Sequence, residues 1–402
     1  MDNQLPLEGI KVVEISTIIT ASLATMMMAD QGAEVIKIEQ TGIGDPMRYL
    51  GTQKGGISAL FANCNRGKKS IDLDLKADDD LAVAKKLISK ADVLINNFRP
   101  GIMDKIGLSE VDCKKLNEKL IYVSINGFGN QGPFSKAPAY DHVVQAMSGA
   151  TDIQSDLEKP QYIKTLLCDK ITAYTVTQSI ISALFKRERI GVADRIDLSM
   201  IDSAVFFLWP DGMMNHTLMD DDVEILAPLT KSYNLYKCKD GYISIAALSD
   251  AQWFGIFRAL DEPNLTEDEK FNTATSRSEN LVELMSLLSK FENLSTTEAL
   301  KRLRKEDVPC AETTTLKELM EHPQLQANEL FKTIESNHQG KVRALRYPAK
   351  FNDQELKNHS PAPKLGEHKD EILKRVFEII FLIQHTCCHL KVVYQESPWK
   401  NY

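Results

Sequence analysis

The 402-residue sequence lacks any apolar run approaching the roughly 18 to 20 residues that a membrane-spanning helix requires. It also lacks a surplus of positive charge, because 48 Lys and Arg residues face 56 Asp and Glu residues, for a net charge of −8. A protein that coats nucleic-acid phosphates needs the opposite balance. We therefore expect neither a membrane nor a nucleic acid as partner, and any cationic site must be local.

Cysteine is scarce and has no C-x-x-C spacing, which argues against a disulfide framework. Near the C-terminus, His385, Cys387, Cys388 and His389 could imitate a metal cluster, but adjacent cysteines do not readily converge on one ion, so we expect no metal site. The segment 1–9 shows neither a secretory nor a transit pattern. These features favour reduced thiols and a cytoplasmic location, with the mitochondrion as the alternative.

Glycine is missing from the turn after the first predicted strand, residues 16–21, where NAD-binding enzymes carry it. The sequence GFGNQG at 127–132 has the dinucleotide-binding spacing, but Pro133 and Pro138 follow where the helix should begin. We interpret it as a glycine-rich loop beside a pocket. The segment NRGKKS at 65–70 lacks the earlier glycine of a P-loop, so it predicts a phosphate contact or a solvated turn rather than NTP hydrolysis.

Short apolar runs alternate with helical patterns through about residue 200, which predicts an α/β fold with a Rossmann-like open parallel sheet. After residue 226 the pattern changes to two strands joined by a turn and then polar helices, which indicates a smaller α+β second domain. The expected strands of the sheet are 10–15, 34–38, 93–96 and 120–125, with helices at 20–30, 78–90, 103–117 and 169–191 between or after them.

Asp169 stands at the start of the longest predicted helix. An acid at this position is ordinarily an N-cap, and the residues alone favour that reading. The same position stabilises an ionised carboxylate, which a carboxylate nucleophile requires. Both readings of Asp169 therefore stay open at this point.

The order of the segments resembles the family III CoA-transferases, a group that includes formyl-CoA, carnitine and bile-acid CoA-transferases and 2-methylacyl-CoA racemases. Each segment alone is weak evidence for the family. Nine such segments in the family's order over about 365 residues are strong evidence for the resemblance. They are 6–9 (PLEG), 26–39 (MMMADQGAEVIKIE), 44–45 (GD), 65–70, 92–101, 127–133, 140–149 (YDHVVQAMSG) with Asp169, 322–325 (HPQL) and 361–368 (PAPKLGEH).

The resemblance implies a large Rossmann-like CoA-binding domain, 1–215, to which the C-terminal segment 331–375 returns, and a small domain at 225–330. It also implies an interlocked homodimer. Resemblance fades near residue 375, and the atypical tail 376–402 receives no function.

The same resemblance makes Asp169 the catalytic nucleophile of an acyl-CoA:carboxylate CoA-transferase. The partners are then an acyl-CoA donor and a free carboxylic acid acceptor, and CoA is part of the substrate rather than a permanently bound cofactor. The implied reaction runs through an aspartyl anhydride and an aspartyl-CoA thioester. The residues that fall where the family contacts CoA are the backbone of Ile18, Ile19 and Thr20, then Lys37, Asn65, Lys68, Asn97, Phe98 and Lys105.

Several departures keep two alternatives open. Racemases pair the aspartate with a histidine, and Tyr140 occupies that position here, with His142 two residues later. A phenol with an ordinary pKa of about 10 is a poor base at neutral pH, so transfer is expected over racemisation, with Tyr140 as the second catalytic candidate. Ile19 stands where the formyl-CoA enzyme has glutamine, Ser22 replaces a proline, and residues 246–250 replace a glycine-rich flap. These changes leave a non-catalytic CoA-binding homologue as the other alternative.

Overall fold

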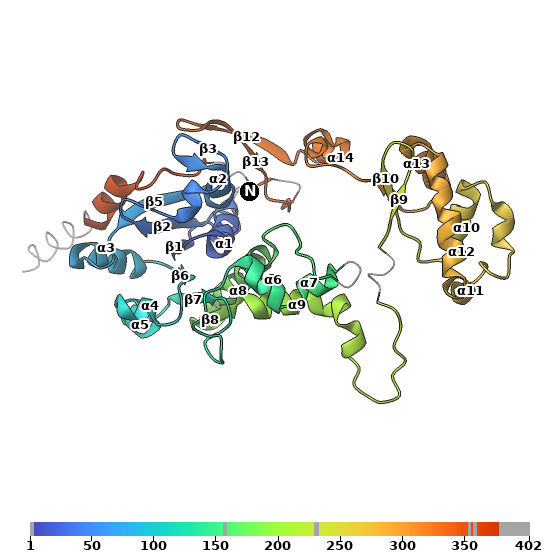
Figure 1. Ribbon diagram of the computed structural model, residues 1–402. Coiled ribbons are helices and arrows are strands. Elements are labelled where there is room, and N and C mark those ends of the chain that lie inside the picture. The colour runs from blue at the N-terminus through green and yellow to red at the C-terminus, as the bar shows by residue number, and fades with distance from the viewer. Residues whose placement is uncertain (1–3, 156–158, 229–232, 353–354, 357–359, 378–402) are drawn as a thin grey trace, which may run out of the picture. The chain divides into compact units, whose positions relative to one another are not determined.

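The computed structural model describes residues 4–155, 159–228, 233–352, 355–356 and 360–377. The described residues form two compact units, one drawn from 4–210 and 330–377 and the other from 211–329 (Figure 1). The tail beyond residue 377, with Cys387 and Cys388, lies outside the described residues. The five cysteines within them are free thiols.

The larger unit is built on a six-stranded sheet in the order β5-β2-β1-β6-β7-β8. Every neighbouring pair in it is parallel. This is the doubly wound order in which the chain starts at the centre and proceeds outward twice, so the predicted open α/β sheet is confirmed. The strands are β1 (Lys11–Ile15), β2 (Glu34–Gln40), β5 (Lys68–Leu73), β6 (Val93–Asn96), β7 (Ile121–Asn126) and β8 (Arg195–Ser199).

Helices cover both faces of the sheet, which is why successive residues of its central strands are buried rather than alternately buried and exposed (Figure 1). On one face α1 (Ile19–Asp30) buries alanine and methionine side chains against the strands, and α8 (Leu167–Ile190) buries alanine, valine, isoleucine and leucine. On the other face α3 (Asp78–Ile88), α5 (Glu110–Leu116) and the helical residues 369–377 bury apolar side chains as well. The chain therefore passes to opposite faces after the neighbouring strands β1 and β6.

The helix predicted over 103–117 is wrong as a single element, because the structure has two, α4 (Ile102–Lys105) and α5. Gly107 adopts a φ of 70° between them, a conformation that ends a helix. Ser109 then starts α5, since its hydroxyl accepts a hydrogen bond from the Asp112 N–H at 3.1 Å. Both signals are local and were present in the sequence.

The smaller unit has its own apolar core around Ile243, Phe291 and Leu303. Its three strands form an antiparallel sheet in the order β11-β10-β9. The strands are β9 (Leu235–Lys237), β10 (Tyr242–Ile245) and β11 (Cys310–Glu312), and the helices are α10 (Asp250–Ala259), α11 (Ala274–Glu279), α12 (Leu281–Leu288), α13 (Thr296–Lys305) and α14 (Pro323–Ala327).

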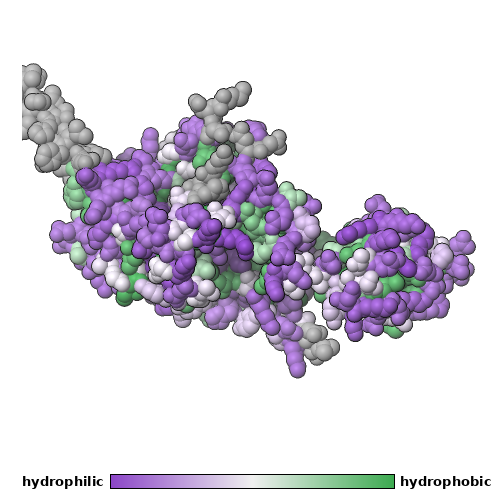
Figure 2. Space-filling model, turned by 90° about the horizontal axis from the view of Figure 1, so that it is seen from above, coloured by the Kyte–Doolittle hydropathy of each residue, from purple (hydrophilic) through white to green (hydrophobic). Residues whose placement is uncertain are grey.

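Shorter elements complete the larger unit. They are β3 (Gln53–Lys54), β4 (Ile57–Ser58), α2 (Ala59–Asn65), α6 (Asp141–Met147), α7 (Ala150–Ile153), α9 (Met200–Gly212), which runs on into the smaller unit, β12 (Phe331–Ser336) and β13 (Gly340–Leu345). The surface in Figure 2 is mostly hydrophilic, with smaller apolar areas between. Among the described residues, no helix combines the length and apolarity needed to cross a bilayer.

Candidate active site

A cavity of about 240 Å³ opens at the carboxyl ends of the strands, where β1 and β6 send the chain to opposite faces. Ligands of open α/β sheets bind at this switch point, because the loops diverge there and leave a crevice. Three loops, the end of the strand at 121–126 and three helix starts line the cavity: Thr17, Ile18, Thr20, Asn97, Phe98, Arg99, Pro100, Ile125, Asn126, Gly127, Ser135, Ala137, Ala139, Tyr140, Asp169 and Met200.

Asp169 lies in the wall of this cavity with 6% of its surface exposed. It is the third residue of α8, whose N-cap is Leu166, so the N-cap reading of Asp169 is wrong. Its backbone N–H donates to Oδ1 of Asp141 at 3.0 Å. Its own carboxylate accepts a short hydrogen bond from the hydroxyl of Thr20. The side chain is thus held in one orientation at the edge of the cavity.

The surroundings of Asp169 raise the pKa of its carboxyl group to about 6. Burial is the main cause, the negative charge of Asp141 adds to it, and the hydrogen bond from Thr20 opposes it. The group is therefore mainly ionised at pH 7, yet poorly solvated. A carboxylate in this state can act as a nucleophile toward a carbonyl carbon.

The loop between β1 and α1 approaches Asp169 in an uncommon backbone conformation. Ile18 has φ 65° and ψ −154°, a region used almost only by glycine and costing about 1–3 kcal/mol for other residues. The side chain of Asn97 brackets the preceding residue, accepting from the Thr17 N–H at 3.0 Å and donating to the Thr17 carbonyl at 2.6 Å. Asp45 Oδ1 accepts from the Ile18 N–H at 3.0 Å.

The glycine-rich segment 127–132 forms a loop after β7 and starts no helix. Gly127 lines the cavity, and a Cβ there would lie 2.2 Å from the Cβ of Ala139. The prediction of a loop beside a pocket is confirmed for Gly127, and the dinucleotide reading has no support in this geometry.

Tyr140 also lines the cavity, directly before α6, with 63% of its surface exposed. Its ring stacks on that of His142, with centroids 6.3 Å apart and planes 7° apart. His142 itself is not among the lining residues of the described cavity. The structure thus brings Ile18, Thr20, Asn97, Phe98 and Tyr140 together around Asp169.

Lys37, Lys68 and Asn65 lie in different surroundings from those that a phosphate contact needs. The two ammonium groups are wholly buried and share the carboxylate of Glu14, at 2.6 Å from Lys37 and 2.8 Å from Lys68. The Lys68 ammonium also donates to Asn65 Oδ1 at 2.9 Å. A contact with CoA stays a prediction for these residues, and the structure gives them an interior network instead.

Four charged groups of this network balance one another, since Asp45 Oδ2 lies 3.0 Å from the ammonium of Lys37. Burial disfavours the charge of Lys37, but Glu14 and Asp45 outweigh it and raise the pKa of this lysine above its usual value. Burial lowers the pKa of Lys68 to about 8, assisted by the charge of Lys37 and opposed by Glu14. Burial disfavours the charged form of Glu14 as well. The two lysines outweigh this effect and hold the pKa of Glu14 below its ordinary range.

Two other predicted residues lie apart from the cavity lining. Ile19 is buried in an apolar cluster at the start of α1, and Lys105 is exposed at the end of α4. Two residues of the site were not predicted from the sequence: Asp141, which accepts a hydrogen bond from the Asp169 N–H, and Arg99, which lines the cavity. Asp141 directly follows Tyr140 and Arg99 directly follows Phe98, so each was one position from a predicted residue.

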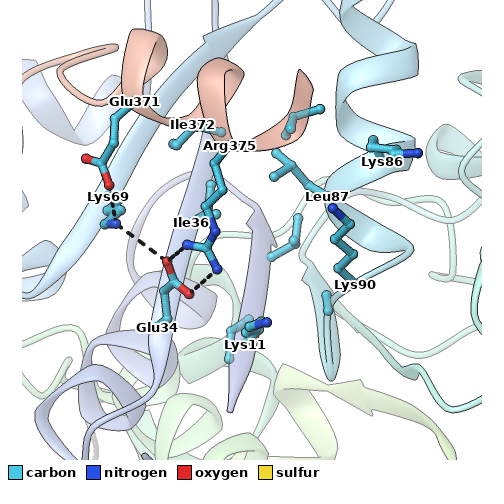
Figure 3. Close-up of a pocket in the computed structure, with 14 residues that line it drawn as sticks. Lys11, Glu34, Ile36, Lys69, Lys86, Leu87, Lys90, Glu371, Ile372 and Arg375 are labelled. Atoms are coloured by element: carbon cyan, nitrogen blue, oxygen red, sulfur yellow. Dashed lines mark hydrogen bonds and ion pairs between the residues drawn. The ribbon is translucent and has the colours of Figure 1, made fainter. Parts of the chain in front are cut away.

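A smaller cavity of about 110 Å³ lies at the opposite, amino ends of the strands (Figure 3). Arg375 donates to both carboxylate oxygens of Glu34, and Lys69 bridges Glu34 and Glu371. These pairs fasten the helical residues 369–377 to β2 and β5. Glu34, Lys69, Glu371 and Arg375 are thus paired with one another, and Asp169 does not line this cavity, so we place the chemistry at the carboxyl ends.

The chain is similar to known proteins over nearly its whole length. The model of the family described as CoA-transferase family III matches residues 7–369. Succinyl-CoA:glutarate CoA-transferase from Homo sapiens is 31% identical over 385 residues, covering 94% of this chain and 87% of that protein. Formyl-CoA:oxalate CoA-transferase from Escherichia coli O157:H7 is 28% identical over 403 residues, covering 92% and 95%.

Solved structures give the same result for the fold. Rv3272 from Mycobacterium tuberculosis in an orthorhombic form superposes with a TM-score of 0.81 at 30% identity, over 92% of this chain and 99% of that one. A CAIB/BAIF family protein from Brucella suis superposes with a TM-score of 0.80 at 32% identity, over 93% and 100%. In the part of the chain described, no group of three or more His, Cys, Asp or Glu converges as a metal site would need.

Proposed function

Because the chain belongs to the family III CoA-transferases, we propose that it transfers CoA from an acyl-CoA donor to a free carboxylic acid through covalent catalysis at Asp169. The observation that carries the proposal is a nearly buried carboxylate in the wall of a cavity at the switch point of the sheet. The relatives named above act, by their names, on succinyl-CoA with glutarate and on formyl-CoA with oxalate. A carboxylic acid as acceptor is the chemistry they share.

In the first half of the proposed reaction, an Asp169 carboxylate oxygen attacks the thioester carbon of the donor. The C–S bond breaks, CoA leaves as thiolate, and a mixed anhydride joins Asp169 to the acyl group. The thiolate then attacks the aspartyl carbonyl, which releases the donor acid as carboxylate and leaves an aspartyl-CoA thioester. No proton is taken up or released, so this half needs no general base.

In the second half, the acceptor carboxylate attacks the aspartyl thioester and displaces the thiolate, forming a new mixed anhydride. The thiolate attacks the acyl carbon of the acceptor, which yields the new acyl-CoA and restores the carboxylate of Asp169. The thiolate has to stay bound throughout, because its loss would leave a hydrolysable anhydride. The loops after β1 and β6, with Ile18, Thr20, Asn97 and Phe98, are where we place the pantetheine arm, and Lys105 could reach its phosphates from α4.

Thr20 and Tyr140 have separate roles in this proposal. The hydroxyl of Thr20 orients the attacking carboxylate and moderates its pKa. Tyr140, exposed at the mouth of the cavity, can donate a hydrogen bond to an acyl oxygen as negative charge develops there. Racemisation would need a second base facing Asp169, and among the described lining residues no histidine occupies that place.

We also propose that a second copy of the chain covers the outer face of α8 and α9 in a homodimer. Phe206 is 80% exposed and Tyr174 is 60% exposed, and both line an open hollow between these helices. Contiguous apolar surface of this kind is uncommon on a monomer. The predicted interlocking of the two subunits belongs to the same proposal.

The decisive experiment is to trap the intermediate. The protein is incubated with succinyl-CoA, quenched with hydroxylamine, digested, and the peptide containing Asp169 is analysed by mass spectrometry. An aspartyl hydroxamate at Asp169 is expected in the native protein, and Asp169→Ala should show none and transfer no label from a free acid into the thioester pool. An unmodified Asp169 in a protein that does transfer CoA would exclude the covalent route.

A further inference from the structure

A chain of contacts leads from the interior of the sheet to the loop that faces the nucleophile. The Lys37 ammonium lies 3.0 Å from Asp45 Oδ2, and Asp45 Oδ1 accepts the Ile18 N–H at 3.0 Å. Two residues after Ile18, the Thr20 hydroxyl bonds to Asp169. We propose that Lys37 and Asp45 are positioning residues, which hold Ile18 in its strained backbone conformation so that the loop presents Thr20 to Asp169. This inference deepens the proposed function and rests on it for the role of Asp169.

The conformation of Ile18 needs an external hold. A β-branched residue at φ 65° and ψ −154° persists only where the surroundings over-determine it. The bracket from Asn97 fixes Thr17, and the Ile18 side chain packs in the apolar cluster with Met47. The bond to Asp45 is the one among these that acts on the peptide N–H of Ile18 itself.

Asp45 in turn depends on Lys37. Its Oδ1 is shared by the N–H groups of Ile18 and Met47, the latter at 2.9 Å, while its backbone N–H donates to Glu39. Its Oδ2 is buried and has no hydrogen-bond partner within the described residues, so the charge of Lys37 alone compensates it. Removing one partner of such a buried pair leaves an uncompensated charge. Without Lys37, we expect the Asp45 side chain to turn away from its buried position, and its hydrogen bond to the Ile18 N–H to weaken.

The chain offers a matched control in a second buried ion pair of the same helix region. Asp30, 4% exposed at the far end of α1, accepts from Arg66 Nε at 3.0 Å. Asp30→Asn and Asp45→Asn both remove a buried, paired carboxylate charge with little change of shape. Asp45 contacts the N-cap residue of α1, Ile18, whereas Asp30 is the last residue of α1. Of the two, only Asp45 contacts the loop at Asp169.

The test compares steady-state CoA transfer by Asp45→Asn, Lys37→Met and Asp30→Asn. We expect kcat to fall up to about tenfold in the first two, no more than in Thr20→Val, with KM for the acyl-CoA changed less than about threefold. The acid limb of the pH–rate profile should move to higher pH in both, because the Thr20 hydrogen bond that lowers the pKa of Asp169 weakens. Asp30→Asn should leave kcat and KM within about twofold of the native values, and the acid limb of its pH–rate profile should stay at the native pH.

A double-mutant cycle adds a second criterion. If Asp45 acts through the loop, Thr20→Val should cost far less in the Asp45→Asn background than in the native protein, because the bond it removes is already weakened. Additive losses would overturn the proposal. Where a single variant fails to fold, Lys37→Met/Asp45→Asn removes both charges together and keeps the network neutral with Glu14 and Lys68.

A readout that does not depend on activity separates this inference from the proposed function. Hydrogen exchange of the peptide covering residues 17–20 should be at least about tenfold faster in Asp45→Asn than in native protein, and unchanged in Asp30→Asn. Equal exchange in all three overturns the positioning role, whatever the activity. Faster exchange without any hydroxamate at Asp169 in the native protein would keep the hold on the loop and reject the nucleophile.

Discussion

The hydroxyl of Thr20 donates a hydrogen bond to the carboxylate of Asp169 across a sequence separation of 149 residues. The bond joins the first turn of α1 to the first turn of α8, the two helices that pack side by side on one face of the sheet. Packing of these helices therefore sets the orientation of the proposed nucleophile.

The acid limit of the reaction should report the ionisation of Asp169. Its pKa of about 6 means that the attacking carboxylate is lost as the pH falls below 6, so kcat/KM should drop about tenfold per pH unit in that range. The profile is measured with saturating acceptor acid in buffers of constant ionic strength. A rate that stays level down to pH 4.5 would show that another group limits the reaction.

Replacing Thr20 with valine should move the acid limb of the pH–rate profile to higher pH. The hydrogen bond lowers the pKa of Asp169, so its removal should raise the acid limb by about one pH unit and reduce kcat at pH 7 about tenfold. Thr177→Val is the control, since Thr177 is a buried threonine of α8 whose hydroxyl donates to the Ala173 carbonyl at 2.7 Å. Identical profiles for the two variants would contradict the assignment.

Asp169 should also lower stability at neutral pH. Its pKa is raised in the folded state, so the protonated form is favoured there, and stability is lost as the pH rises from about 4 through 6. We expect Asp169→Asn to be more stable than native by about 1–3 kcal/mol at pH 8, and by much less at pH 4. Urea unfolding at both pH values measures the difference, and a gain independent of pH would point to packing instead.

The outer face of α8 and α9 should be covered in solution. Light scattering during gel filtration is expected to give twice the mass of one chain for native protein. Phe206→Glu should lower that mass or cause aggregation, while Val111→Glu, at an exposed position on α5, should not. A native protein that runs as a single chain at micromolar concentration would remove the dimer from the proposal.

Much of the fold could be predicted because its signals are local. The run at 10–15 and the segment 34–38 mark β1 and β2, and α8 ends at its C-cap Gly191, the last residue of the predicted helix 169–191. The division between α4 and α5 was missed although Gly107 and Ser109 mark it, because the apolar spacing on either side suggested continuity.

The site was less accessible from sequence because its geometry comes from long-range packing. The backbone conformation of Ile18 could not be read from a β-branched residue, which ordinarily avoids positive φ. The burial of Lys37 could not be read either, since a lysine in a strand is usually placed at a surface, and Glu14 and Asp45 that compensate it stand 23 and 8 positions away. Family resemblance located Asp169, and only the fold placed Thr20 beside it.

The attachment of the C-terminal segment to the first strands has a consequence for biosynthesis. Arg48 donates to the Pro363 carbonyl at 3.0 Å, His368 donates to the Ser70 carbonyl, and Ile372 covers one face of the sheet. When residues 1–210 leave the ribosome, these partners have yet to be translated, and the whole insertion 211–329 precedes them. One apolar face of the nascent sheet therefore stays uncovered until the C-terminal segment has been synthesised. Chaperones can bind this face during that interval.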